Sequence, residues 1–380
     1  MSEFDGEKSI YTRNGQLATW PSGKFSTTVY TNEILDFVDK LGKDENFFAV
    51  ASYTAPHWPL QPPADYKNKY KGKYEDGYEK LRETRLQGAK SRGIINDQLA
   101  LPLGLDHIKK WDDLNEEEQL IEARKMELYA AMLEHLDFEI SRLLKGLEES
   151  GTLENTVIIF MSDNGADFLD FYQHPIGTFI RETYNNDLEN MGDPSSFVSY
   201  GPQWAQASMS PFSYYKGYLA EGGVRAPLII SGPGISEGQN DSYFHIQDVA
   251  PTILDIFGVS HPGNDEDKTY PPMIGKSFTE VLEGKKKGIH AASEFFIDDF
   301  QGMASVVQGD FKLLNTEDPS NHDKFKLYHL QNDPGEKKNI RSNHKQQVRL
   351  MLEAWEEYRK TYHVVYPENT NNLNPYKEKK

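Results

Sequence analysis

The chain has 380 residues, of which 37% are hydrophobic and 12% aromatic, and this composition fits a globular protein with one large and one smaller domain. Its 59 acidic and 41 basic side chains give a formal charge of −18, which argues against binding to nucleic acid or anionic membranes. The chain has no cysteine, which excludes disulfides, thiolate zinc sites and a cysteine nucleophile. It shows neither an apolar run of about 20 residues nor a secretory signal at its start, so as encoded we expect it to stay in the cytoplasm.

The first hundred or so residues predict one helix, one strand and a long irregular stretch. Apolar side chains recur at helical spacing over residues 30–41, with an expected helix start at residue 31 or 32. Residues 47–53 suit a buried strand, which leads into the segment APHWPLQ at 55–61. Residues 61–105 are rich in Tyr, Lys, Gly and Pro without a clear period, so they are predicted to be only partly ordered.

A long amphipathic helix is predicted next. Asn115 and Glu118 have the spacing of a capping box, and apolar residues then recur at helical spacing until Gly151 stops the run. After the following strand, about fifty residues between Asp163 and Lys216 show little periodicity, which is long for a plain connection in a compact domain. We therefore expect this stretch to form a wall of a substrate cleft.

The strand that follows the long helix ends in a turn that bears candidate metal ligands. Residues 157–161 are all apolar, as in a strand covered on both faces, and Gly165 allows a sharp exit. This places Asp163 and Asn164 at the carboxyl end of the strand, where open α/β sheets bind ligands. An ordinary Asp-Asn-Gly turn without chemistry is the alternative.

The remaining elements divide into two groups. A strand at 228–230 and a helix over 245–259 continue the alternation of strands and helices, which predicts an α/β domain with a mostly parallel sheet covered on both faces. Beyond residue 288, short strands at 303–308, 311–314 and 325–330 precede a helix at 348–362, which is the pattern of a small antiparallel sheet with one helix. We therefore predict domains at 1–287 and 288–380, with the last fifteen residues frayed.

Six segments, in this order along the chain, resemble those of the sulfatase family, specifically the bacterial arylsulfatases of the Pseudomonas type. They are APHWPLQ at 55–61, YAAMLEHLD at 129–137, FMSDNGA at 160–166, YGPQWAQA at 200–207, Lys216 followed by EGGVRAP at 221–227, and LYHL with DPGE between 327 and 336. One such segment would be a weak signal, whereas six in order are a strong one.

The resemblance implies an alkaline-phosphatase-like α/β sandwich with a small C-terminal domain, and hydrolysis of sulfate esters. In that family a formylglycine made from a Cys/Ser-x-Pro-x-Arg motif is the nucleophile, and Ca²⁺ holds the sulfate oxygens. The same resemblance makes Asp163 and Asn164 metal ligands, and His57 and Lys216 catalytic donors to the sulfate. From local sequence alone, His57 could instead be a turn histidine stacked on Trp58, and Lys216 a solvated surface lysine.

The chain departs from the family pattern in its N-terminal part. It has no Pro-x-Arg sequence, so the formylglycine nucleophile is absent, and it has no first strand ending in paired aspartates. Asp298 and Asp299 imitate such a pair but follow the start of the smaller domain. Ca²⁺ takes six to eight oxygen ligands, so the site is expected to be incomplete in this chain. Without a central strand the main sheet would have an exposed edge or a gap, which pairing with a second copy or with a separate N-terminal piece would relieve.

Three interpretations follow. In the first, the chain is the C-terminal portion of an arylsulfatase, inactive by itself, whose intact family hydrolyses small sulfate esters with calcium. In the second, it is a non-catalytic sulfatase relative that binds anionic ligands or a partner chain. In the third, it is a phosphodiesterase or phosphonate hydrolase of the same superfamily that acts with a different nucleophile.

Overall fold

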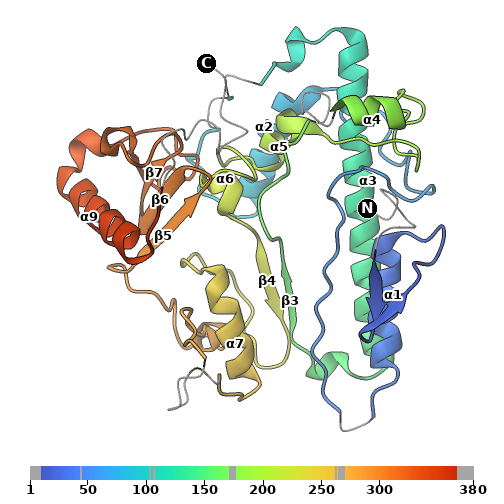
Figure 1. Cartoon of the computed structure of the whole chain (residues 1–380), viewed down its shortest axis with the longest axis horizontal. Coiled ribbons are helices and arrows are strands. Elements are labelled where there is room, and N and C mark those ends of the chain that lie inside the picture. Colours follow the sequence, from blue (N-terminus) through green and yellow to red (C-terminus); the bar gives the residue numbers. More distant parts are fainter. Residues whose placement is uncertain are drawn as a thin grey trace.

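The computed structural model describes residues 10–42, 45–101, 104–105, 108–170, 177–261, 263 and 270–365. The helix α3 (Glu116–Glu149) is its longest element, and α1 (Ser26–Val38) packs alongside it (Figure 1). The capping box is confirmed, because the Asn115 side chain accepts from the Glu118 backbone N–H at 3.0 Å while Glu118 accepts from the Asn115 N–H at 2.9 Å. Two backbone N–H groups at the helix start, which would otherwise lack partners, are thereby satisfied.

Helix α1 begins at Ser26, five residues before the earlier of the two expected starts. Thr27 and Thr31 are fully buried in it, and the Thr31 hydroxyl lies 2.9 Å from the hydroxyl of Tyr53. A search for apolar periodicity passes over such buried threonines, which explains the difference.

Three helices lie in segments without a clear period. They are α2 (Gly77–Ser91), α4 (Gly177–Thr183) and α5 (Gly201–Ser208). Helix α2 packs on α5, and the contact is aromatic: the Tyr78 ring lies edge-on to both Trp111 and Trp204, at 5.6 and 5.5 Å. Trp204 also donates to the Glu122 carbonyl of α3 at 2.8 Å, so these rings join the irregular segments to the long helix.

The predicted strand before the Asp-Asn-Gly turn is present as β3 (Ile158–Met161), and it pairs with β4 (Leu228–Ser231). This pair is antiparallel, with Ile159 opposite Ile230. All strand pairs in the described part of the chain are antiparallel, so the expected parallel pairing is not found there. Residues 47–53 are not a strand either, because no described strand hydrogen-bonds to them.

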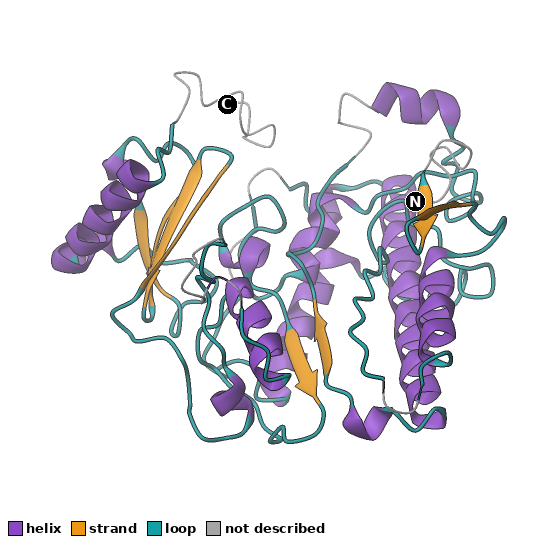
Figure 2. Cartoon of the chain, turned by 60° about the horizontal axis from the view of Figure 1, so that its bottom comes forward, coloured by secondary structure: helices purple, strands orange, loops and turns teal. Residues whose placement is uncertain are grey.

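The C-terminal part is an antiparallel sheet with one helix, as predicted. Its strands have the order β5 (Phe295–Phe300), β6 (Met303–Gln308), β7 (Phe311–Asn315) and β8 (Lys326–His329). The helix α9 (Lys345–Thr361) covers one face, and Figure 2 shows this unit at the opposite end of the molecule from α1 and α3. The division at residues 287 and 288 stays a prediction, and the expected frayed end at 366–380 lies outside the described residues.

Further short elements connect these parts. The predicted helix over 245–259 is a 3₁₀ turn, η3 (Ile246–Asp248), that continues into α7 (Val249–Ile256). The others are β1 (Tyr11–Arg13), β2 (Gln16–Ala18), α6 (Glu221–Val224), α8 (Thr279–Leu282) and the 3₁₀ turns Trp111–Asp113, Leu153–Asn155, His322–Lys324 and Arg341–Asn343. Among the helices in the described ranges, none combines the length and the apolar character needed to cross a bilayer.

Candidate active site

His57 is held in a defined orientation by its neighbours. Its Nδ1 lies 2.9 Å from the carbonyl oxygen of Trp58, and its ring packs against the Trp58 ring with centroids 4.4 Å apart. At the other side of the imidazole, Nε2 lies 3.2 Å from Oδ2 of Asp167. Both ring nitrogens therefore contact oxygen atoms, and the side chain remains 32% exposed. The contact with Trp58 is tilted, with 47° between the two ring planes, rather than stacked.

Lys216 reaches the same point from a different part of the chain. Its Nζ lies 3.0 Å from Oδ2 of Asp167 and 3.4 Å from Nε2 of His57. Its backbone N–H donates to the Ala166 carbonyl at 3.0 Å, which ties residues 213–221, here called the lysine loop, to the segment just after the Asp-Asn-Gly turn. The structure therefore brings His57 and Lys216 together, as expected for two donors to one anion.

Glycines make this approach possible. A Cβ on Gly222 would lie 2.1 Å from the Tyr214 carbonyl oxygen, and one on Gly223 would lie 2.0 Å from that of Tyr218. A Cβ on Gly165 would lie 1.9 Å from the Gly222 carbonyl oxygen. Helix α6 thus packs by backbone contact against both the lysine loop and the Asp-Asn-Gly turn, which explains why Gly-Gly follows Lys216 so closely in the sequence.

Asp167 contacts both of the predicted donors, although the sequence did not predict it as part of the site. Burial opposes its ionisation, but hydrogen bonds from His57, the Leu169 backbone N–H and Lys216 outweigh this and lower its pKa to about 2. Asp167 therefore carries a negative charge between two basic side chains. Its position two residues after Gly165 was the available signal, because a carboxylate there lies next to the proposed metal turn.

Asp163 and Asn164 lie where the sequence predicted, at the carboxyl end of β3. Asp163 is exposed and Asn164 half-buried, and no hydrogen bond or ion pair joins their side chains to His57 or Lys216 among the described residues. The described residues also contain no cluster of three or more His, Asp or Glu side chains suited to a metal. Two residues supply at most three of the six to eight oxygens that Ca²⁺ requires, so this donor set alone does not fit the ion.

The second aspartate pair has a structural place. Asp298 and Asp299 lie within β5, where Asp298 is 4.0 Å from Nε2 of His245 and Asp299 accepts from the Tyr358 hydroxyl at 3.3 Å. Burial raises the pKa of Asp298, so this carboxyl is less readily ionised than usual. These partners are those of residues in a packed sheet.

The lysine loop is also attached to the C-terminal sheet. Ser213 donates to the Gly335 carbonyl at 2.5 Å, and the Glu221 backbone N–H donates to Glu336 at 2.9 Å. Lys312 of β7 is 1% exposed, and its Nζ lies 2.8 Å from Glu221 and 3.1 Å from Glu336. Burial raises the pKa of Glu336 to about 7. The C-terminal sheet therefore contacts the loop that presents Lys216.

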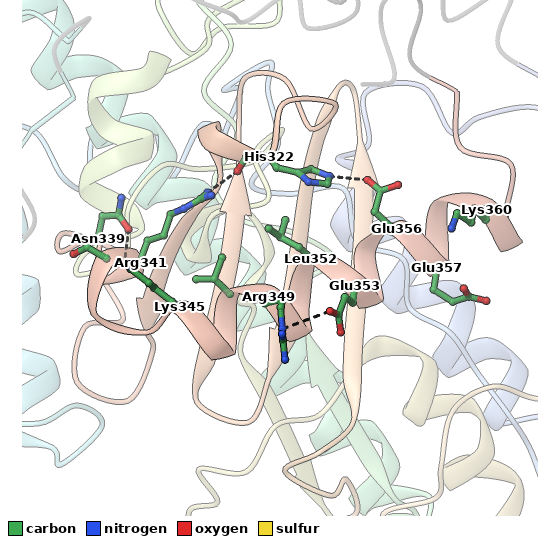
Figure 3. A pocket seen from close by; sticks show the side chains of 12 residues that line it. His322, Asn339, Arg341, Lys345, Arg349, Leu352, Glu353, Glu356, Glu357 and Lys360 are labelled. Carbon is green, nitrogen blue, oxygen red and sulfur yellow. Dashed lines mark hydrogen bonds and ion pairs between the residues drawn. The ribbon is translucent and has the colours of Figure 1, made fainter.

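The described cavities differ greatly in size. A small cavity of about 30 Å³ adjoins His57, between Phe25, Thr54 and Met132. A wider pocket of about 840 Å³ lies on the far side of the C-terminal unit, beside α9 (Figure 3). There Arg341 donates to the His322 carbonyl, His322 contacts Glu356 and Arg349 contacts Glu353. These polar side chains pair with one another, and none belongs to the site around His57.

Two family models match the chain. The sulfatase model matches residues 1–259, and the model of the C-terminal region of N-sulphoglucosamine sulphohydrolase matches residues 212–361. An uncharacterized sulfatase of Schizosaccharomyces pombe is 35% identical over 358 residues, or 91% of this chain and 64% of its own length. An arylsulfatase of Klebsiella aerogenes is 36% identical over 288 residues, or 74% of this chain and 61% of its own length. The chain thus spans less than two thirds of these relatives.

Solved structures show the same fold. A protein solved with its substrate D-glucosamine-2-N,6-O-disulfate has a TM-score of 0.53 and 20% identity, with coverage of 92% of this chain and 72% of its own. A phosphonate monoester hydrolase from Silicibacter pomeroyi has a TM-score of 0.51 and 17% identity, with coverage of 92% and 64%. The fold class is accordingly the alkaline-phosphatase-like α/β fold with a small C-terminal antiparallel sheet. With a family model that covers most of its length and a relative matched over nearly all of it, this chain belongs to the sulfatase family.

Proposed function

We propose that this chain forms part of the active site of an arylsulfatase-like sulfuric ester hydrolase, in which His57 and Lys216 bind the sulfate group. The observation that supports this is the meeting of the two basic side chains, 3.4 Å apart, at the end of a loop and beside the Asp-Asn-Gly turn. Both remain about one third exposed, so a ligand can reach them. The family membership supports the same reaction class.

The proposed chemistry rests on charge. When a sulfate ester is cleaved, negative charge develops on the oxygens of the sulfuryl group and of the leaving group. Lys216 supplies an ammonium donor and His57 a ring N–H donor, and such donors stabilise this charge more in a partly dry site than in water. Asp167 keeps the two in place before the anion arrives, so little reorganisation is needed. His57 and Lys216 are the proposed catalytic residues, and Asp167 is a positioning residue.

The Ca²⁺ site and the nucleophile need groups that this chain does not supply. Asp163 and Asn164 are the proposed ligands of Ca²⁺ from this chain, and the missing oxygens and the formylglycine must come from polypeptide outside these 380 residues. When bound, Ca²⁺ would offset negative charge on the sulfate. We therefore expect these 380 residues alone not to hydrolyse sulfate esters.

A second candidate is a phosphonate or phosphodiester hydrolase of the same superfamily. The phosphonate monoester hydrolase with the same fold favours this candidate, but at 17% identity its likeness concerns the fold alone. The two basic side chains could bind either anion. A non-catalytic relative that only binds anions through His57 and Lys216 is the third candidate, and it is separated from the first two by whether turnover appears once the chain is supplied with the unmatched part of an arylsulfatase.

The test is the binding of 4-nitrophenyl sulfate and phenylphosphonate to the 380-residue chain, measured by calorimetry, together with a colorimetric assay for turnover. The proposal expects sulfate ester binding that is lost in Lys216→Ala and in His57→Ala, without turnover. Lys276→Ala is the matched control, because Lys276 also pairs with one carboxylate, Glu294, at 2.7 Å but lies elsewhere. Equal binding in all variants would reject the site, and a preference for phenylphosphonate would favour the second candidate.

A further inference from the structure

The side chain of Gln206 connects α5 to the backbone that leads to Lys216, on the way from α5 to α6 (Figure 1). Gln206 is 3% exposed. Its Nε2 donates to the Phe212 carbonyl at 2.9 Å, and its Oε1 accepts from the Tyr214 N–H at 3.2 Å. A primary amide can bind a carbonyl and an N–H at once, because it has a donor and an acceptor side by side. The Gln206 amide therefore fixes the backbone on both sides of Ser213.

Tyr214 has a backbone conformation that a tyrosine rarely adopts. Its φ is 62°, in the left-handed region, where bulky side chains are disfavoured and asparagine is more common. Its N–H is bound by the Gln206 amide, and its ring stacks on Tyr218 with centroids 4.4 Å apart. Such a conformation persists only where the surroundings determine it, and it is found most often at functional sites. The Gln206 amide thus helps to maintain a strained backbone two residues before Lys216.

The conformation of Tyr214 determines the direction of the chain at Lys216. Between these two residues, Tyr215 is 1% exposed, and its ring stacks on Phe168 with centroids 4.7 Å apart and 13° between the planes. Phe168 follows Asp167, which accepts from the Nζ of Lys216 at 3.0 Å. A rotation of the backbone at Tyr214 would therefore move Tyr215 off its partner ring and the lysine away from the carboxylate.

We infer that Gln206 is a positioning residue for Lys216. Its amide holds Tyr214 in the left-handed conformation, and this directs the lysine side chain to the carboxylate and the imidazole of the site. The hydrogen bonds to residues 335 and 336 hold the two ends of the lysine loop, whereas Gln206 holds a residue within it. The inference rests on the proposed function only for the role of Lys216 in sulfate binding, because the position of this side chain can be measured without a ligand.

Chemical labelling of Lys216 in the 380-residue chain tests the inference. Its side chain is 35% exposed, so acetic anhydride can reach it, and its ion pair with Asp167 slows the reaction. Gln206→Met keeps the length of the side chain and loses both hydrogen bonds. The acetylation rate of Lys216, measured by mass spectrometry, is expected to rise about tenfold in this variant, as when a hydrogen bond to a charged group is lost. Equal rates in the wild type and in folded Gln206→Met would overturn the inference.

A matched variant separates this effect from a general loss of stability. Asn315 is also a buried amide, 1% exposed, and it donates to the Asp318 carbonyl at 2.8 Å and accepts from the Asp318 N–H at 2.9 Å in the C-terminal part. Asn315→Leu is expected to leave the acetylation rate of Lys216 unchanged. Lys276, which also pairs with a carboxylate, is the internal reference for the reagent in every sample. An equal rise in Asn315→Leu and Gln206→Met would overturn the inference.

Two substitutions of Tyr214 test the backbone conformation itself, and they also serve if Gln206→Met does not fold. Asparagine and valine are similar in size and both remove the ring, but only asparagine adopts the left-handed conformation readily. Tyr214→Val is expected to raise the acetylation rate of Lys216, whereas Tyr214→Asn is expected to keep it near that of the wild type. Equal rates in these two variants would show that the conformation does not position the lysine, and would overturn the inference.

Calorimetric binding of 4-nitrophenyl sulfate separates this inference from the proposed function. If both are correct, the affinity falls in Gln206→Met together with the rise in acetylation. A rise in acetylation with no change in affinity, or with no binding by the wild type, would retain Gln206 as the residue that positions Lys216. It would reject only the proposed role of Lys216 in sulfate binding.

Discussion

The Nζ of Lys216 lies 3.4 Å from Nε2 of His57, although 159 positions separate the two residues in the chain. Oδ2 of Asp167 contacts both, at 3.0 and 3.2 Å, and so holds the two side chains to one oxygen atom. The pair therefore depends on a third residue that is neither of the expected donors.

Replacement of Asp167 by asparagine is expected to change how stability depends on pH. The pKa of Asp167 is about 2 in the folded protein against an ordinary value of 3.8, so its charge stabilises the fold above pH 4, and this is lost as pH falls through 2. Urea unfolding should show wild type more stable than Asp167→Asn by roughly 2 kcal/mol at pH 5. The difference should shrink as pH approaches 2, and a constant difference would contradict the ion pairs.

Loss of either donor should reduce catalysis. In a protein completed with the missing part, His57→Ala and Lys216→Ala should each lower the hydrolysis of 4-nitrophenyl sulfate by about 10²- to 10³-fold, the usual cost of one transition-state donor. The measurement is kcat/KM under identical calcium concentrations. The exposed lysine variant Lys276→Ala controls for a general effect of charge, and unchanged rates in both site variants would remove them from the catalytic set.

The turn after β3 is expected to bind the metal on which activity depends. In the completed protein, chelation of Ca²⁺ is expected to stop turnover, and added Ca²⁺ to restore it. Asp163→Ala should prevent the restoration, because it removes a charged oxygen ligand from the proposed site. Titration of the protein with Ca²⁺ by calorimetry checks this directly. If Asp163→Ala binds Ca²⁺ as tightly as the wild type, the turn is not the metal site.

Glu336, which is buried beside Lys312, is expected to make the protein less stable as pH rises, whereas Asp167 makes it more stable. The pKa of Glu336 is raised from 4.5 to about 7, so the folded state holds a proton that the unfolded state has released, and stability falls as pH rises from about 4.5 to 7. Glu336→Gln should flatten this slope, with a difference on the order of 1–3 kcal/mol between pH 5 and pH 8. Thermal unfolding at several pH values measures it, and an unaltered slope in the variant would refute the assignment.

A methyl group on Gly222 should disturb the lysine loop. Its Cβ would lie 2.1 Å from one backbone oxygen and 2.4 Å from another, so Gly222→Ala is expected to lower stability by roughly 2 kcal/mol or more and to weaken sulfate binding. Gly88→Ala is the control, because Gly88 lies within α2, where alanine is favoured by about 0.5–1 kcal/mol. Calorimetric binding and urea unfolding of both variants decide whether backbone contact holds the loop.

Local patterns in the sequence predicted several elements well. The capping box at Asn115, the strand before Asp163 and the strands of the C-terminal sheet follow from hydrogen-bonding geometry and apolar periodicity within short windows, and the structure has all of them. The strand expected at 47–53 is not formed, because a strand needs a partner that a local pattern cannot supply.

The site was predicted only in part for a similar reason. His57 and Lys216 stood out through the resemblance of their segments, and the structure brings them together. Asp167 did not, because its role follows from contacts with residues 110 positions before it and 49 after it, which no local motif reveals. Helices α2, α4 and α5 were missed because their buried residues mix glycine, alanine and polar side chains with few large apolar ones, so that no apolar period results.

The hydrogen bonds from Ser213 to Gly335 and from Glu221 to Glu336 bear on how the chain can be divided. The small C-terminal sheet is easily taken for an accessory that could be removed without loss of chemistry. Yet residues 335 and 336 of this C-terminal part hydrogen-bond to both ends of the segment that carries Lys216, at residues 213 and 221. A fragment cut before residue 288 would keep every candidate site residue in its sequence, and would lose the brace that holds one of them in position.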